Sequence, residues 1–138
     1  MSKRILVVDD HDVVRQGVRL ILCSHPEWGV VGEAEDGFDA LAKIESLDPD
    51  LVILDISMPR KDGLEVLAEL SEKKVHSRVL VLTMHDSKGL AAALQKAGAS
   101  GYVIKTQAGR DLVTAVQNIL DGSVFFRAET PASAPSVL

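Results

Sequence analysis

Five short apolar runs recur along the chain, separated by longer stretches in which apolar and polar residues mix. Four of the five runs show no polar alternation, which indicates strands buried on both faces, as in a parallel sheet. The stretches between them repeat apolar residues every three or four positions, as amphipathic helices do. The predicted strands cover residues 5–8, 30–32, 51–54, 79–82 and 101–104.

Capping and breaking residues set the limits of the intervening helices. The second helix follows Asp36 and stops before Pro49, and the fifth stops at Gly122. The fourth is predicted over residues 87–97, with Asp86 and Ser87 as its cap. The predicted apolar faces are Val14, Val18, Ile21 and Leu22; Ala40, Leu41, Ile44 and Leu47; Leu64, Leu67 and Leu70; Leu90, Leu94 and Ala97; Leu112, Val113, Val116, Ile119 and Leu120.

This alternation of strand and helix predicts an α/β fold. Right-handed crossovers between parallel strands place helices on both faces of a doubly wound sheet. Five such units suit a five-stranded parallel sheet of flavodoxin-like order 2-1-3-4-5. We expect one domain over residues 1–122, followed by a C-terminal tail or truncated linker at 123–138, which is rich in small residues and proline.

Composition narrows the function classes. With 138 residues, 46% of them hydrophobic, the chain can build one substantial core. Its net charge of −5 argues against direct nucleic-acid binding. The single cysteine, Cys23, excludes an internal disulfide and is expected to be packed. The first apolar run is too short for a signal peptide or membrane span, so we expect a cytoplasmic protein without membrane contact.

Charged and hydroxyl side chains follow four of the predicted strands. Asp9 and Asp10 follow the first strand, Asp55 the third, Thr83 the fourth and Lys105 the fifth. Ligands of open parallel sheets bind beyond the carboxyl ends of the strands. We therefore expect these five side chains at one rim of the fold.

Three neighbouring carboxylates repel one another unless a cation lies among them. Mg²⁺ suits such a site because it prefers oxygen ligands, and with Lys105 it would attract a phosphoryl group. An oxygen of Asp55 could then attack phosphorus, with Thr83 hydrogen-bonded to the phosphoryl oxygens. Taken singly, each residue has a simpler interpretation: Asp10 as a helix cap, Asp55 as a turn residue, Lys105 as a solvated charge.

These residues resemble the signature of a known family. Val8-Asp9-Asp10, Leu54-Asp55, Met58-Pro59 with Asp62-Gly63, Thr83 and Lys105 are similar to the receiver domains of two-component response regulators, over about residues 3–122. Residues 8–17, 101–105 and 121–123 resemble the NarL/FixJ subgroup, whose receivers precede a LuxR-type helix-turn-helix domain. The resemblance implies a regulatory phosphoacceptor rather than an enzyme.

The resemblance also implies residue roles. Asp55 would accept the phosphoryl group from a sensor histidine kinase. Asp10, Asp55 and the backbone carbonyl of Ser57 would hold Mg²⁺, with Asp9 acting through water. Thr83 and Lys105 would bind the phosphoryl oxygens.

The resemblance implies that Thr83 and Tyr102 change position on phosphorylation. This switch is expected to alter an output surface formed by the fourth helix, fifth strand and fifth helix. The resemblance further implies that the domain forms a homodimer on phosphorylation. It also implies that the full protein binds DNA through a helix-turn-helix domain missing from this chain. Thr106 departs from the family pattern, because many receivers have a cis proline after the lysine.

Three alternatives remain open. A Mg²⁺-dependent phosphohydrolase would need a second acid where Ser57 stands. A flavin or nucleotide module would need a glycine-rich or hydroxyl-rich phosphate loop after the first strand, where the chain instead has Asp9-Asp10-His11-Asp12. A degenerate receiver could serve only as a scaffold. Among the histidines, His11 and His25 are expected to be structural or surface residues, and His85 a solvated loop residue.

Overall fold

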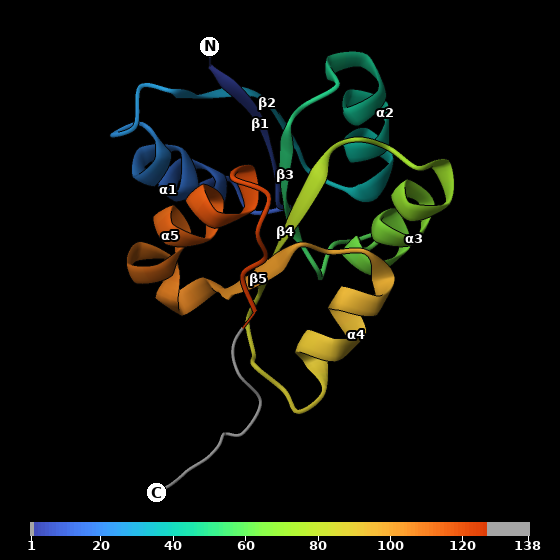
Figure 1. The fold of residues 1–138 in the computed structure, drawn as a ribbon. Coiled ribbons are helices and arrows are strands. Elements are labelled where there is room, and N and C mark those ends of the chain that lie inside the picture. The colour runs from blue at the N-terminus through green and yellow to red at the C-terminus, as the bar shows by residue number, and fades with distance from the viewer. Residues whose placement is uncertain (1, 127–138) are drawn as a thin grey trace, which may run out of the picture.

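The structure of the chain is a computed structural model that describes residues 2–126. Its single sheet has five parallel strands in the order β2-β1-β3-β4-β5, with helices on both faces (Figure 1). The predicted fold class and strand order are confirmed. The elements are β1 (Lys3–Val8), α1 (Asp12–Leu22), β2 (Trp28–Ala34), α2 (Gly37–Leu47), β3 (Leu51–Asp55), α3 (Gly63–Lys73), β4 (Arg78–Thr83), α4 (Leu90–Ala97), β5 (Gly101–Ile104), a 3₁₀ turn (Lys105–Gln107) and α5 (Ala108–Leu120).

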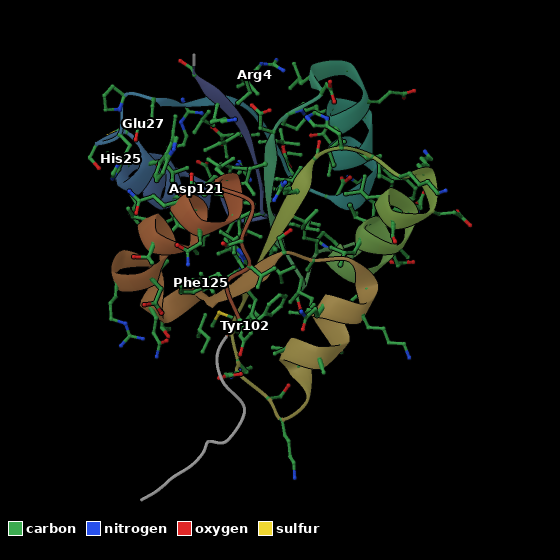
Figure 2. The ribbon with its side chains drawn as sticks, in the orientation of Figure 1. Arg4, His25, Glu27, Tyr102, Asp121 and Phe125 are labelled. Atoms are coloured by element: carbon green, nitrogen blue, oxygen red, sulfur yellow. The ribbon has the colours of Figure 1, made fainter. Side chains whose placement is uncertain are left out.

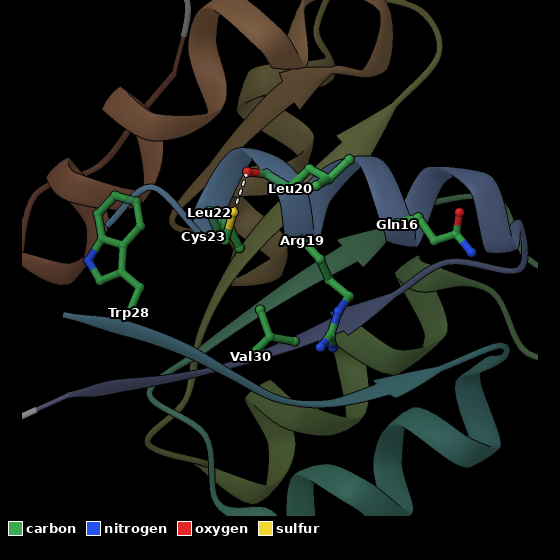
Figure 3. A pocket seen from close by; sticks show the side chains of 7 residues that line it. All are labelled: Gln16, Arg19, Leu20, Leu22, Cys23, Trp28 and Val30. Atoms are coloured by element: carbon green, nitrogen blue, oxygen red, sulfur yellow. Dashed lines mark hydrogen bonds between the residues drawn. The ribbon is translucent and has the colours of Figure 1, made fainter. Parts of the chain in front are cut away.

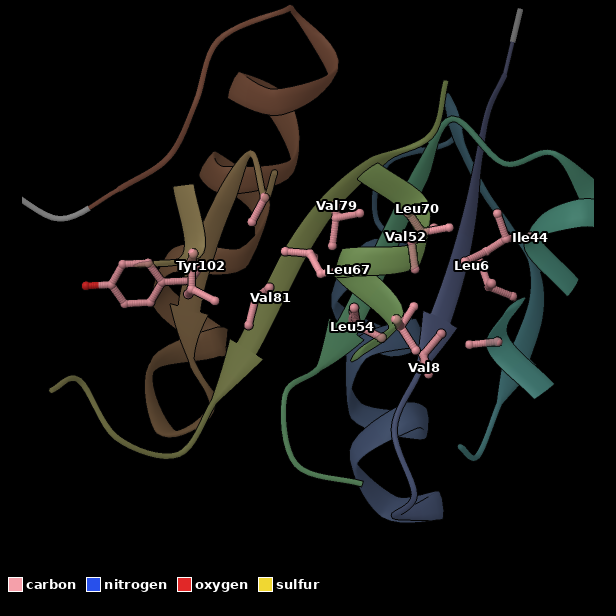
Figure 4. Packing of buried hydrophobic residues seen from close by; sticks show 14 of the residues in the cluster. Leu6, Val8, Ile44, Val52, Leu54, Leu67, Leu70, Val79, Val81 and Tyr102 are labelled. Atoms are coloured by element: carbon pink, nitrogen blue, oxygen red, sulfur yellow. The ribbon is translucent and has the colours of Figure 1, made fainter. Parts of the chain in front are cut away.

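Alternate residues of each strand point into two separate hydrophobic clusters. Ile5 and Val7 of β1 belong to the cluster that packs beneath α1 and α5. Leu6 and Val8 belong to the opposite cluster, which also takes residues from α2, α3 and α4. Figure 4 shows part of this second cluster around the strands. Burial on both faces explains why the strands lack polar alternation.

The helical periodicity was accurate in α1, α2 and α5 and wrong at one position in α3. Leu64 was assigned to the apolar face of α3, but it is 47% exposed. Val66 is buried instead, together with Leu67 and Leu70. Spacing of three alone does not distinguish the two faces, because the stripe that faces the core is wide enough to hold neighbouring residues such as Val66 and Leu67.

The predicted start of the fourth helix is wrong. α4 begins at Leu90, after Gly89 at φ 80°, and has no side-chain cap. Asp86, predicted as part of that cap, instead accepts a hydrogen bond from the Tyr102 hydroxyl at 2.8 Å. Cys23 was also predicted wrongly, because it is exposed at the C-terminal end of α1 rather than packed.

The segment after α5 returns along the open edge of β5. The Phe125 N–H donates to the Ser100 carbonyl at 2.9 Å, and the Tyr102 N–H donates to the Phe125 carbonyl at 3.0 Å. Figure 2 shows Tyr102 and Phe125 together at this edge. The boundary at residue 122 stays a prediction, and residues 127–138 of the predicted tail lie outside the described part of the chain.

Candidate functional site

The carboxyl ends of β1, β3 and β5 bring three charged side chains into contact. Lys105 Nζ lies 2.9 Å from Asp9 Oδ2 and 3.1 Å from Asp55 Oδ1. The side chain of Asp9 is 0% exposed and that of Asp55 is 2% exposed, so both charges are removed from water. The predicted gathering of Asp9, Asp55 and Lys105 at one rim is thus present in the structure.

Asp55 occupies an unfavourable position for a carboxylate. Burial raises its pKa to about 6, and the charge of Asp9 adds to the effect, against opposing contributions from the Ser57 N–H and Lys105. The Ser57 N–H donates to Asp55 Oδ1 at 3.2 Å. The other oxygen, Oδ2, is buried and has no hydrogen-bond partner among residues 2–126. This oxygen is available to a ligand.

The pKa of Lys105 is also raised, and for a lysine this favours the charged form. Burial alone would lower its pKa, but the contact with Asp9 and the charges of Asp55 and Asp9 outweigh burial, and the pKa of Lys105 is raised. Lys105 therefore stays protonated at neutral pH. One ammonium group faces two buried carboxylates, and this leaves the rim with a net negative charge.

A four-residue group at this rim has the geometry to hold a cation. Asp9, Asp10, His11 and Asp55 each offer one ligand atom, and these atoms lie within 4.8 Å of one another. Asp10 Oδ1 and Asp55 Oδ2 are buried without a hydrogen-bond partner in the described chain. Leaving carboxylate oxygens unsatisfied is costly, whereas oxygen ligands with excess negative charge suit a hard divalent cation. The donor set fits such an ion.

A cavity of about 430 Å³ opens beside Asp55. Thr83 lines it at the end of β4 and is 5% exposed, with its hydroxyl donating to the His85 carbonyl at 3.2 Å. Ser57 and Lys105 line the same cavity. A small anion in this cavity would contact both Lys105 and Thr83. Its full lining is His11, Val14, Asp55, Ile56, Ser57, Thr83, Met84, His85 and Lys105.

Close backbone packing holds the loop that follows Asp55. A Cβ added at Gly63 would lie 2.4 Å from the Asp55 carbonyl oxygen, so the N-terminus of α3 can sit against β3 only with glycine there. Gly37 donates its N–H to the Lys61 carbonyl at 3.0 Å, and buried Asp36 pairs with Arg60. These contacts hold the β3–α3 loop against the start of α2.

Tyr102 lies at the β5 edge of the core. It is 2% exposed, and its hydroxyl reaches Asp86 in the β4–α4 loop. Figure 4 shows its ring extending away from Val81 and the rest of the cluster. The side chain therefore links β5 to the loop that follows Thr83.

A second cavity, of about 500 Å³, lies between α1 and β2, away from the acidic rim (Figure 3). Leu20, Leu22, Trp28 and Val30 make it mostly apolar. It has no cluster of titratable groups that could perform chemistry. The acidic rim is the better candidate because its buried oxygens lack partners.

The sequence identified most of this site but missed one member. Asp9, Asp55 and Lys105 lie in contact, and Asp10, Ser57 and Thr83 lie around them. His11 was predicted to be a structural or surface residue, and its side chain is 67% exposed, but the contact of its ring with Asp9 and Asp10 was not predicted. Its place directly after two aspartates at a strand end was the available signal.

Among residues 2–126 no helix is long and apolar enough to cross a bilayer.

Comparison with known proteins identifies the class to which this fold and rim belong. Residues 5–117 match the family described as the response regulator receiver domain. Structurally, the signal receiver domain of the response regulator NarL from Mycobacterium tuberculosis superimposes with a TM-score of 0.82 at 35% identity, covering 88% of this chain and 98% of that one. The chain belongs to the response regulator receiver family.

Longer relatives identify the subgroup of receiver domains to which the chain is similar. The nitrate/nitrite response regulator NarL of Escherichia coli is 38% identical over 134 residues, which cover 96% of this chain and 62% of the relative. The transcriptional regulatory protein DegU of Brevibacillus brevis is 36% identical over 122 residues, 88% of this chain and 52% of that one. The chain thus spans about half to three-fifths of the relatives' length, and the predicted NarL-type subgroup is confirmed.

Proposed function

We propose that Asp55 is the phosphoacceptor of this receiver domain and that Mg²⁺ bound at the acidic rim supports the transfer. The single observation that carries this is the position of Asp55: it is buried beside Lys105, its Oδ2 makes no hydrogen bond in the described chain, and the residue lines a ligand-sized cavity. A sensor histidine kinase would be the donor. The domain would then act as a regulator that is phosphorylated, and not as an enzyme with an external substrate.

Phosphoryl transfer to Asp55 requires that the reacting atoms be positioned and that the charge on the phosphoryl oxygens be stabilised. An Asp55 carboxylate oxygen attacks phosphorus as the bond from phosphorus to the kinase imidazole nitrogen breaks, and that nitrogen then takes up a proton. Lys105, raised in pKa and 3.1 Å from Asp55, stabilises charge on the phosphoryl oxygens. The Thr83 hydroxyl would exchange its contact with the His85 carbonyl for a phosphoryl oxygen.

Asp10, Asp55 and the Ser57 carbonyl would hold the cation, with Asp9 acting through water. When bound, Mg²⁺ would neutralise charge shared between the carboxylates and the phosphoryl oxygens. The unpartnered oxygens of Asp10 and Asp55 support this assignment. Asp9 Oδ2 lies 2.9 Å from Lys105 Nζ, and the action of Asp9 through water is what the resemblance to the family implies.

Thr83 and Tyr102 would convert phosphorylation into a changed surface. Drawing Thr83 toward a phosphoryl group pulls on the β4–α4 loop, and Asp86 in that loop holds the Tyr102 hydroxyl. A ligand shifts such an equilibrium only through contacts that differ between two states. We infer that α4, β5 and α5 form the output surface, through which the phosphorylated domain forms a homodimer.

We infer further that residues 1–122 constitute the receiver domain and residues 123–138 a linker. The full protein would act in the cytoplasm and control transcription through a DNA-binding domain outside this chain. Support comes from the relatives, one of which is described as a transcriptional regulatory protein and extends well beyond the matched region. The receiver itself, at net charge −5, is not expected to bind DNA.

Intact mass after incubation with acetyl phosphate tests the assignment. The wild-type chain with Mg²⁺ should gain one phosphoryl group, and the gain should be absent in Asp55→Asn and strongly reduced with EDTA. Equal phosphorylation of the Asp55→Asn variant would refute the proposal. Continuous hydrolysis of a generic phosphate ester, many turnovers per site, would favour the phosphohydrolase alternative instead.

A further inference from the structure

His11 points its ring into the acidic rim. Its Nδ1 atom lies 3.3 Å from Asp9 Oδ1 and 3.2 Å from Asp10 Oδ1, and Asp55 belongs to the same group of potential ligands. We propose that His11 is a nitrogen ligand to the divalent cation at this rim and makes the rim prefer transition-metal dications such as Ni²⁺ over Mg²⁺. This rests on the proposed function, because it assumes that a cation binds there.

The spacing agrees with shared coordination. Two ligands at about 2.1 Å from one metal and at right angles to each other are separated by roughly 3.0 Å. The distance of 3.2 Å between His11 Nδ1 and Asp10 Oδ1 is close to that separation. Little movement of either side chain would be needed for both atoms to bind one ion.

One oxygen beside the ring, and one further oxygen of the same group of residues, have no hydrogen-bond partner in the described chain. Asp10 Oδ1, the atom next to His11 Nδ1, is buried and makes no hydrogen bond with residues 2–126. Asp55 Oδ2 is in the same condition, and Asp55 is 1% exposed. One nitrogen and two carboxylate oxygens without hydrogen-bond partners in the described chain therefore lie at the rim, in addition to the carbonyl proposed above.

Ligand chemistry then favours one class of cation. Mg²⁺ binds oxygen and is reluctant to lose its waters, so an imidazole adds little to its affinity. Imidazole nitrogen suits nickel, copper, iron and zinc, whose divalent affinities exceed those of harder ions at mixed nitrogen and oxygen sites. A histidine beside the aspartates changes the selectivity of the rim more than its affinity for Mg²⁺.

Apart from its contacts with Asp9 and Asp10, the imidazole makes no hydrogen bond that holds the start of α1. His11 is the N-cap residue of α1, but its side chain makes no capping hydrogen bond. Its backbone N–H donates to Asp9 Oδ1 at 2.9 Å, and an alanine would keep that contact. The side chain is 67% exposed, so the ring can turn toward an incoming ion.

Binding of the metals alone separates this role from a plain ion pair between His11 and the aspartates. Calorimetric titrations with Ni²⁺ and with Mg²⁺, and Ni²⁺ titrations in competing Mg²⁺, should be made on wild-type protein and His11→Ala. His85→Ala is the matched control, because His85 lines the same cavity but is not in the ligand group. We expect His11→Ala to weaken Ni²⁺ binding on the order of 10-fold or more while Mg²⁺ affinity changes little.

Pulsed electron paramagnetic resonance of bound Mn²⁺ gives a second readout. A nitrogen hyperfine coupling should be present in wild-type protein and His85→Ala and absent in His11→Ala. Equal Ni²⁺ affinity and an unchanged coupling in His11→Ala would overturn the inference, and would leave the proposed function intact if Mg²⁺ still binds. Failure of Mg²⁺ to compete with Ni²⁺ would place the nickel elsewhere and also overturn it. If Mg²⁺ neither binds nor supports phosphorylation, the proposed function fails as well.

Discussion

Lys105 Nζ lies 3.1 Å from Asp55 Oδ1, and this contact joins the end of β5 to the end of β3 across β4. The same ammonium lies 2.9 Å from Asp9 Oδ2, so one cation balances two buried anions. Removing one partner of a buried ion pair is more damaging than the pair is stabilising, because a charge is left without compensation. The contact therefore makes Lys105 a determinant of stability, in addition to its proposed role in phosphate binding.

Replacing Lys105 by methionine keeps most of the aliphatic stem and removes the charge. Without divalent cations at pH 7, we expect Lys105→Met to lower the free energy of unfolding by about 3 kcal/mol. Urea unfolding with EDTA measures the loss, and added Mg²⁺ should recover part of it. Lys96→Met, at an exposed position of α4, is the control and should change little. Equal effects of the two substitutions would contradict the account.

The raised pKa of Asp55 predicts a pH-dependent cost to stability. In the unfolded chain this carboxyl has its ordinary pKa of 3.8, and in the folded chain its pKa is about 6. The folded state therefore binds more protons between these values, and its stability falls as pH rises from about 4 to about 6. In EDTA the loss attributable to Asp55 should be on the order of 2 kcal/mol.

Asp55→Asn removes this titration and should be more stable than wild type at pH 7 in EDTA. The difference should shrink toward pH 4, where the wild-type carboxyl is protonated, and also with Mg²⁺, which compensates the charge. Unfolding by urea across this pH range is the measurement. A variant that is less stable than wild type at pH 7 without metal would show that Asp55 is not strained as a carboxylate.

Gly63 is predicted to be irreplaceable for steric reasons. In Gly63→Ala the new methyl group would lie 2.4 Å from the Asp55 carbonyl oxygen and 2.8 Å from Ile56 Cα, both of them backbone atoms that cannot move aside. We expect a loss of about 2 kcal/mol or more and weaker Mg²⁺ binding. Gly17→Ala, in α1 with nothing within 4 Å, should instead stabilise the protein by roughly 0.5–1 kcal/mol. Similar thermal shifts in both variants would contradict the prediction.

The hydrogen bond between Tyr102 and Asp86 predicts coupling between β5 and the β4–α4 loop. A double-mutant cycle of Tyr102→Phe and Asp86→Ala should give an interaction energy of about 1 kcal/mol in the unphosphorylated protein. The cycle is needed because each residue has other interactions. With beryllofluoride and Mg²⁺ bound, the coupling should change if this contact belongs to the switch. An identical value in both states would exclude it from the switch.

Much of the fold followed from the sequence because burial on both faces suppresses polar alternation in the strands. Asp9, Asp55 and Lys105 could be placed at one rim because parallel strands end on the same side. Details that depend on local backbone conformation could not be predicted: Leu64 is solvent-exposed, and α4 begins at Leu90 after Gly89 rather than after Asp86. The exposure of Cys23 was missed because it depends on where α1 ends relative to the core.

The contact of His11 with the aspartates was not predicted, although the residue directly follows Asp9 and Asp10 in the sequence. A histidine after a strand is compatible with a solvated loop, and only the geometry of the turn brings its ring within 3.3 Å of Asp9. Likewise, the ion pair between Asp36 and Arg60 joins residues 24 positions apart, and the place of Asp36 before the second helix gave no indication of this partner.

Chemical trapping of the phosphorylated residue tests the central claim most directly. Borohydride reduces an acyl phosphate to an alcohol, so an Asp phosphorylated with acetyl phosphate and Mg²⁺ becomes homoserine, which peptide mass mapping locates. The account predicts homoserine at position 55 alone, in strongly reduced yield when Mg²⁺ is replaced by EDTA. Homoserine at position 9 or 10, or unmodified Asp55 in protein that carries phosphate, would contradict it.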